Sequence, residues 1–138
     1  MSLPATLDDA AEEWDALDPD ERYRLLIDLG RALPAMPDAL KTDATLVRGC
    51  SAAVWVYPTR EAGGRLRFLA DSNAAITKGI IALILLAVQD RAADEVAALD
   101  IPALLGPFQL STQLSSNRTQ GIPNMIALIR ETASRNAA

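Results

Sequence analysis

The residue best suited to chemistry in this chain is its only cysteine, Cys50, and the chain contains no histidine. One cysteine cannot close an internal disulfide, form a C-x-x-C pair or complete a zinc site. Without histidine, the Cys–His and Ser–His pairs of thiol and serine hydrolases are excluded. A cluster scaffold is disfavoured as well, because an iron–sulfur cluster is normally held by several thiolates. Whatever chemistry Cys50 performs therefore proceeds without an imidazole.

Two interpretations of Cys50 compete on the residues alone. A lone cysteine is most often a small buried hydrophobic residue. Its neighbours favour a reactive thiol instead, because Gly49 permits turn conformations and Arg48 places a permanent positive charge nearby. A thiolate in that setting could attack a persulfide sulfur held on another protein, without a general base. The surroundings of Cys50 thus favour a reactive thiol on a loop and are compatible with a sulfur acceptor, while burial of the cysteine stays open.

Length, charge and hydropathy limit the classes of protein to which the chain can belong. Its 138 residues, half of them apolar, predict one domain over residues 1–138 with a core that needs no disulfide or metal. A net charge of −5 disfavours nucleic-acid binding, which needs a basic face. There is no signal-peptide pattern, and the longest apolar run, Gly79 to Val88, is far shorter than the roughly 20 residues that span a bilayer. We therefore expect a cytoplasmic protein with no nucleic-acid or membrane partner.

Helical periodicity begins the chain and strand periodicity follows it. Leu7 to Leu17 predicts a short acidic helix, and Asp18-Pro19-Asp20-Glu21 is a strong start signal for a second helix that stops before Pro34. Three short segments then alternate as β-strands, with a turn at Glu61-Ala62-Gly63-Gly64 before the last one: Thr45–Val47, Ala53–Tyr57 and Arg65–Ala70. Cys50 lies in the connection between the first two, and Trp55 is expected to pack in the core.

The remainder of the chain is predicted to be helical. Asp71-Ser72-Asn73 offers caps for a buried helix through Val88, and a short helix over Ala93–Leu99 precedes a turn at Ile101-Pro102. A last helix is expected over Ser116–Ser134, with a break near Gly121-Ile122-Pro123 because proline removes a helical hydrogen bond. The predicted fold class is α+β, with a three-stranded antiparallel sheet packed with several helices.

Four short motifs, in order along nearly the whole chain, resemble the SufE family of sulfur acceptors and the closely similar CsdE proteins. None of them is specific alone, but their shared order and spacing are. They are Glu21-Arg22-Tyr23 through Leu29-Gly30-Arg31-Ala32-Leu33-Pro34; Val47-Arg48-Gly49-Cys50 with Val54-Trp55; Ala70-Asp71-Ser72-Asn73-Ala74 with Lys78-Gly79; and Leu114-Ser115 with Arg118, Gly121 and Met125.

The resemblance implies a SufE/NifU-like fold and a carrier rather than an enzyme. Cys50 would receive persulfide sulfur from a SufS- or CsdA-like cysteine desulfurase, stimulate that enzyme, and pass the sulfur on for iron–sulfur cluster assembly, with a scaffold complex as a further partner. Such a desulfurase uses pyridoxal phosphate, and this cofactor would belong to the desulfurase. No cofactor or metal is therefore expected on this chain. Besides Cys50, the candidate residues for supporting the loop or docking the partner are Arg48, Gly49, Ser51 and Arg118.

The chain departs from the family pattern beside Cys50. Ala52 stands where relatives carry serine in their C-x-S-x-V-W run, and Asn73 replaces the usual aspartate. These changes leave two hypotheses open. The first is a sulfur carrier that uses Cys50, and the second is an interaction module that regulates a desulfurase without carrying sulfur.

Overall fold

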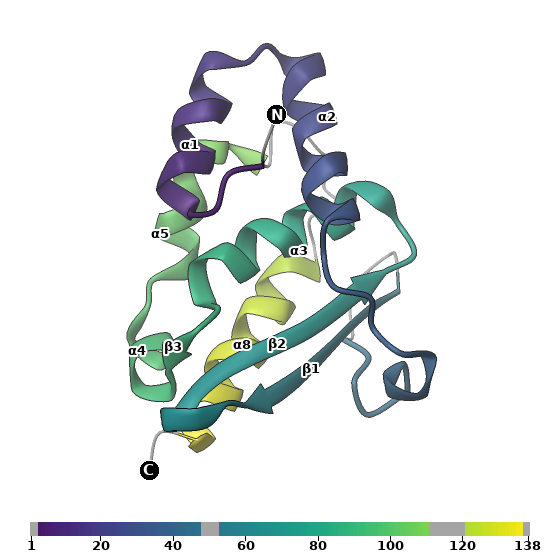
Figure 1. Ribbon diagram of the computed structural model, residues 1–138, viewed down its shortest axis with the longest axis vertical. Coiled ribbons are helices and arrows are strands. Elements are labelled where there is room, and N and C mark those ends of the chain that lie inside the picture. The colour runs from purple at the N-terminus through teal and green to yellow at the C-terminus, as the bar shows by residue number, and fades with distance from the viewer. Residues whose placement is uncertain (1–2, 48–52, 111–120, 137–138) are drawn as a thin grey trace.

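The computed structural model describes residues 3–47, 53–110 and 121–136. The first two helices form a hairpin, α3 crosses below it, and the long β1–β2 hairpin lies at the opposite end of the molecule, in front of α8 in Figure 1. The described elements, in chain order, are α1 (Leu7–Ala16), α2 (Pro19–Arg31), η1 (Asp38–Leu40), β1 (Val54–Arg60), η2 (Ala62–Gly64), β2 (Arg65–Ser72), α3 (Ala75–Val88), β3 (Arg91–Ala92), α4 (Ala93–Ala98), α5 (Ile101–Leu105), η3 (Gly106–Phe108) and α8 (Gly121–Asn136).

The start of α2 follows from local chemistry. Asp18 accepts a hydrogen bond from the Glu21 N–H at 2.9 Å, and the Glu21 carboxylate accepts one from the Asp18 N–H at 3.1 Å. This reciprocal capping box and Pro19 in the first turn satisfy backbone donors that the helix leaves unpaired. The predicted start of the second helix is therefore confirmed.

The sheet is three-stranded and antiparallel, in the order β1-β2-β3, which confirms the predicted fold class. The turn between β1 and β2 uses Gly63 and Gly64 at positive φ, 81° and 75°, a conformation that favours glycine. Buried side chains alternate along both strands and point to the helices, as the period of two requires. They are Val54 and Val56 of β1 and Leu66, Phe68, Ala70 and Ser72 of β2.

The identity of one strand was wrong in the prediction. Thr45–Val47 forms only an isolated antiparallel bridge, between Leu46 and Trp55, and the third strand is Arg91–Ala92. The chain returns to β2 because Asp90 adopts a left-handed backbone, with φ at 60°. Gln89 then covers the edge of β2, since its side chain hydrogen-bonds both the N–H and the C=O of Phe68 at 2.9 Å. These contacts join residues distant in sequence, and no local sequence pattern predicts them.

One helix also differs from the prediction. A helix, α5, begins where the sequence predicted a turn, because Asp100 caps it by accepting from the Ala103 N–H and Pro102 sits in the tolerant first turn. The described part of the last helix, α8, runs from Gly121 to Asn136 and includes Pro123. The expected residues 116–120 of that helix lie outside the described chain.

The helices α2 and α3 approach each other unusually closely. A Cβ atom added to Gly79 would lie 2.2 Å from the Leu26 carbonyl oxygen, and one added to Gly30 would lie 2.9 Å from the Gly79 nitrogen. The two helices therefore touch backbone to backbone, which only glycine permits. Around this contact α3 buries most of its length, as its apolar sequence predicts.

Replacing Gly79 with alanine should lower the free energy of unfolding by at least about 2 kcal/mol, because the added methyl group forces the backbones of α2 and α3 apart. Urea denaturation followed by circular dichroism measures this. Gly106→Ala is the matched control, since nothing lies within 4 Å of its added Cβ atom, and a change within about 0.5 kcal/mol is expected. Equal stability of the two variants would contradict the close approach of the helices.

Candidate functional site

The five residues predicted from the sequence to form the site lie outside the described part of the chain: Arg48, Gly49, Cys50, Ser51 and Arg118. The structure does describe the residues on both sides of the segment 48–52, which carries Cys50. The elements that bind those two ends define where in the fold the cysteine segment is attached.

The two ends of the segment 48–52 are joined to each other. The Val47 N–H donates to the Val54 carbonyl at 2.8 Å, and the Val56 N–H donates to the Thr45 carbonyl at 2.9 Å. Val47 and Val54 are both buried. The described residues on either side of the cysteine segment therefore meet at one place, the start of β1.

The outgoing end is also bound to the end of β2. The Ala53 N–H donates to Oδ1 of Asn73 at 3.0 Å, and the Asn73 N–H donates to the Ala53 carbonyl at 3.3 Å. These two bonds extend the β1–β2 pairing one step beyond the Val54–Ser72 pair. The expectation that Asn73 caps the following helix was wrong, since the N-cap of α3 is Ala74, whose N–H donates to the Ser72 hydroxyl at 3.2 Å. Asn73 is instead a site residue that sequence reasoning missed.

A charged cluster lies beside this junction on the outer face of the hairpin. Trp55 and Asp71 are cross-strand partners there. Asp71 binds two ammonium groups, with Oδ2 2.8 Å from Lys41 Nζ and Oδ1 3.2 Å from Lys78 Nζ. The Lys41 ammonium also lies 5.5 Å from the centre of the Trp55 ring, within cation–π range. We call Lys41, Trp55, Asp71 and Lys78 the Asp71 cluster.

Trp55 does not pack in the core as predicted. Its side chain is partly buried on the outer face of the sheet, under Lys41. The strand alternation that buries Val54 and Val56 turns Trp55 to the other face. The alternation of residues along β1 indicated that Trp55 faces outward, but its large aromatic ring favoured the prediction of burial in the core.

Asp71 and Lys41 have shifted pKa values. Burial alone would raise the pKa of Asp71, yet hydrogen bonds from Lys41, the Ser72 N–H and Lys78 outweigh it and place that pKa below its ordinary value of 3.8. The hydrogen bond to Asp71 raises the pKa of Lys41 above its ordinary value of 10.5, against a smaller opposing effect of desolvation. Asp71 and Lys41 are therefore both charged throughout the neutral pH range.

The segment that leads to the cysteine is organised around Thr45. Its hydroxyl donates to the Leu40 carbonyl and accepts from the Thr42 N–H at 3.1 Å, while the Thr45 N–H donates to the Thr42 carbonyl at 3.1 Å. This turn connects Lys41 to the Leu46 bridge through a short hydrogen-bonded path. The position of Lys41 is thus linked to the incoming end of the cysteine segment.

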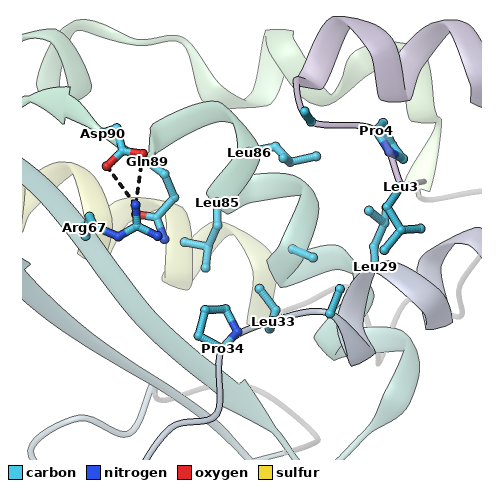
Figure 2. Close-up of a pocket in the computed structure, with 13 residues that line it drawn as sticks. Leu3, Pro4, Leu29, Leu33, Pro34, Arg67, Leu85, Leu86, Gln89 and Asp90 are labelled. Carbon is cyan, nitrogen blue, oxygen red and sulfur yellow. Dashed lines mark hydrogen bonds and ion pairs between the residues drawn. The ribbon is translucent and has the colours of Figure 1, made fainter.

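An apolar pocket of about 340 Å³ lies elsewhere, between α2, α3 and the N-terminal segment. Figure 2 shows Leu29, Leu33, Leu85 and Leu86 around it, with the Arg67–Asp90 ion pair at one end. Its lining, as far as the structure describes the chain, includes neither end of the segment 48–52 nor any member of the Asp71 cluster.

No group of three or more acidic or cysteine side chains that could hold a metal ion occurs among residues 3–47, 53–110 and 121–136. Over the same ranges, no helix has both the length and the apolar character that a membrane span requires.

Sequence reasoning missed Lys41 entirely and assigned Asp71 and Asn73 to helix capping. Asp71, Asn73 and Lys78 all lie in one of the four motifs quoted above, and that shared motif was the available signal. Nothing local marked Lys41, because its partners Trp55 and Asp71 are brought to it by the β1–β2 pairing.

Asn73→Ala should speed hydrogen exchange of the Ala53 amide by roughly an order of magnitude, because it removes the side-chain acceptor of a hydrogen bond that contributes about 1 kcal/mol. NMR-detected exchange measures the effect directly. Asn73→Asp is the matched control, since a carboxylate oxygen can accept the same bond and should preserve the protection. Equal protection in wild type and Asn73→Ala would show that the bond does not form in solution.

Asp71→Asn should reduce stability by an amount that depends on pH. The pKa of Asp71 is lowered in the folded state, so its charge stabilises the fold fully above the unfolded value of about 3.8 and less as the pH falls toward the folded value. Urea denaturation of wild type and variant, from about pH 6 downward, should give curves that converge in acid. A gap that widens below about pH 4 would contradict the ion pairs of Asp71.

Comparisons with known proteins agree on the family. A family model described as SufE, an Fe–S metabolism associated domain, matches residues 8–133. The chain is 40% identical over 103 residues to the sulfur acceptor protein CsdE of Escherichia coli strain K12, a match that covers 75% of this chain and 70% of CsdE. An uncharacterized SufE-like protein of Rhizobium etli is 35% identical over 97% of this chain and 93% of its own length. For a similar protein of Rhizobium meliloti the identity is 34%, over 96% and 94%.

A solved structure shares the fold at low sequence identity. The solution structure of a hypothetical protein from Thermus thermophilus aligns with a TM-score of 0.76, over 98% of both chains, at 17% identity. That likeness concerns the fold alone. Because the family model matches nearly all of the chain and relatives match it along almost their whole length, the chain belongs to the SufE family, whose domain is associated with Fe–S metabolism.

Proposed function

We propose that this protein accepts sulfur from a cysteine desulfurase onto Cys50, as a persulfide, for iron–sulfur cluster assembly. The observation that carries the proposal is the attachment of the segment 48–52, whose two ends are bonded to each other at the start of β1 and to Asn73 at the end of β2. The segment contains the only thiol of the chain. Membership of the SufE family and the name of the relative CsdE, a sulfur acceptor protein, support the same role.

The transfer is a thiol–persulfide exchange that balances without an added oxidant or reductant. The Cys50 thiolate attacks the outer sulfur of the persulfide on the desulfurase cysteine. A new S–S bond forms on Cys50 as the S–S bond on the desulfurase breaks, and the desulfurase cysteine departs as a thiolate. The proton of the terminal sulfur stays with it or exchanges with water. Cys50 ends as a persulfide and the partner ends with a free active-site thiolate.

This chemistry agrees with the absence of histidine from the chain. A thiolate needs no general base to attack sulfur, and a cationic neighbour such as Arg48 lowers the pKa of a thiol. Gly49 and Ser51 are the sequence neighbours of Cys50 and are proposed to support its segment. We propose Arg118 as a further cation that anchors the segment or faces the partner. The role of all five residues is a proposal from the sequence and the family.

The partner is a SufS- or CsdA-like cysteine desulfurase, and its pyridoxal phosphate generates the sulfane sulfur. Taking that sulfur away returns the desulfurase to its starting state, so the carrier stimulates the enzyme without being an enzyme itself. We place the protein in the cytoplasm, where thiols are kept reduced, and expect Cys50 to deliver its sulfur to a scaffold complex. We also propose that residues 1–138 act as one domain.

A second candidate is a module that regulates the desulfurase without carrying sulfur. The observation that favours it is Ala52, which stands where the family pattern has a hydroxyl beside the reactive cysteine. A regulator of this kind would keep the docking surface and lose the chemistry. The two functions differ in whether stimulation requires Cys50.

Incubation with a cysteine desulfurase and L-cysteine should add the mass of one sulfur atom to the wild-type protein, in a form removed by dithiothreitol. Intact-mass spectrometry measures the gain. Cys50→Ser should show neither the added mass nor stimulation of the desulfurase, because it removes the only thiol. Stimulation that survives in Cys50→Ser, without added sulfur in wild type, would establish the regulatory module instead.

A further inference from the structure

The geometry points to Asp71 as a positioning residue for this sulfur transfer, acting through Lys41 and Lys78 on the place where the cysteine segment is attached. The inference rests on the proposed function. Asp71 lies two residues before Asn73, whose hydrogen bonds bind the outgoing end of that segment. The role inferred for Asp71 is to orient the segment, and no contact with the reacting sulfur is proposed.

Asp71 connects three parts of the fold that are far apart in sequence. It lies near the end of β2, opposite Trp55 of β1. One carboxylate oxygen binds Lys41, from the segment that leads to the cysteine, and the other binds Lys78, from the first turns of α3. The Asp71 side chain is only 15% exposed, and the lysine side chains are 25% and 31% exposed. The three charges are thus held in fixed relation at the surface of the hairpin.

The contact with Lys41 restrains the incoming end of the cysteine segment. The ammonium sits between the Asp71 carboxylate and the Trp55 ring, so the side chain has two anchors on the sheet. From Lys41 the chain passes through the Thr45 turn to the Leu46–Trp55 bridge. Trp55 therefore meets both Lys41 and Leu46, which couples the ammonium to the last described residues before the cysteine.

The contact with Lys78 ties the same carboxylate to a closely packed part of the core. Lys78 directly precedes Gly79, whose backbone lies against the Leu26 carbonyl of α2. A shift of the Lys78 backbone would therefore require α3 to move against α2. Through Asp71, the position of the surface segment around Lys41 depends on this pair of helices as well as on the hairpin.

The expected effect on stability is small, and this separates positioning from simple folding support. Ion pairs near the protein surface contribute little to the free energy of unfolding. Catalytic and transfer steps are far more sensitive to placement, because a misplacement of about 1 Å can cost on the order of 100-fold in rate. If Asp71 orients the attachment of the cysteine segment, its loss should be visible in the transfer rate before it is visible in stability.

The test compares Asp71→Asn with wild type in desulfurase assays at increasing concentrations of this protein. We expect the maximal stimulated rate to fall roughly tenfold, while the concentration for half-maximal stimulation changes little, because docking is retained and only the transfer is slowed. Lys41→Gln should behave in the same way. Lys41→Arg should recover most of the rate, since a guanidinium can bind the carboxylate and lie over the Trp55 ring.

Asp90→Asn is the matched control, because Asp90 also pairs with a basic side chain, Arg67, but on the opposite edge of β2 and away from the cysteine segment. Its stimulated rate should equal that of wild type. Tryptophan fluorescence gives an independent readout, since the emission of Trp55 should shift in Asp71→Asn and Lys41→Gln, while Trp14 is buried in the core.

The outcomes separate the inference from the proposed function. If wild type gains no sulfur on Cys50, the proposed function fails and the inference fails with it. If wild type gains sulfur and Asp71→Asn transfers at the same rate, only the inference is overturned. If only the concentration for half-maximal stimulation rises in Asp71→Asn, Asp71 acts in docking. If the maximal stimulated rate falls equally in Asp71→Asn and Asp90→Asn, the effect is a non-specific one of charge. Either result overturns positioning.

Discussion

The contact on which the rest of this structure depends is the backbone-to-backbone approach of α2 and α3. Gly79 of α3 lies against the Leu26 carbonyl, and Gly30 of α2 lies against the Gly79 nitrogen. Neither position has space for a methyl group, so the crossing of the two helices is set by main-chain atoms rather than by adjustable side chains. Because α3 directly follows β2, this contact also decides where the end of the β1–β2 hairpin lies (Figure 1).

The β1–β2 hairpin packs on that core and binds the residues on both sides of the cysteine segment. Hydrogen bonds join Val47 to Val54 and Ala53 to Asn73, and ion pairs join Lys41 and Lys78 to Asp71. The two kinds of interaction differ in their consequences. The backbone bonds continue the sheet and contribute to stability, whereas the ion pairs lie near the surface, where their net contribution is small but their geometry is specific.

A carrier of sulfur needs little machinery beyond one accessible thiolate and a surface that presents it to a partner. The composition is compatible with so simple a requirement, since the chain has a single cysteine and no histidine. The apolar pocket between α2, α3 and the N-terminal segment lies away from the attachment of the cysteine. In this protein the chemistry is proposed on the segment 48–52, which joins the sheet between Val47 and Ala53.

Features that depend on neighbouring residues could be predicted from the amino-acid sequence. The capping box of α2, the glycine turn of the hairpin, the buried α3 and the choice of Cys50 as the candidate nucleophile all follow from short patterns, and the family follows from four such motifs in order. Tertiary structure alone decided which strands pair and which charges meet. Arg91–Ala92 is too short to carry a period, Asn73 bonds to Ala53 rather than to its own helix, and Lys41 finds Asp71 only because β2 brings it there. The physical reason is the range of the interactions. Capping and turn formation satisfy backbone groups a few residues away, whereas strand pairing and ion pairing join atoms whose proximity exists only after the core has formed.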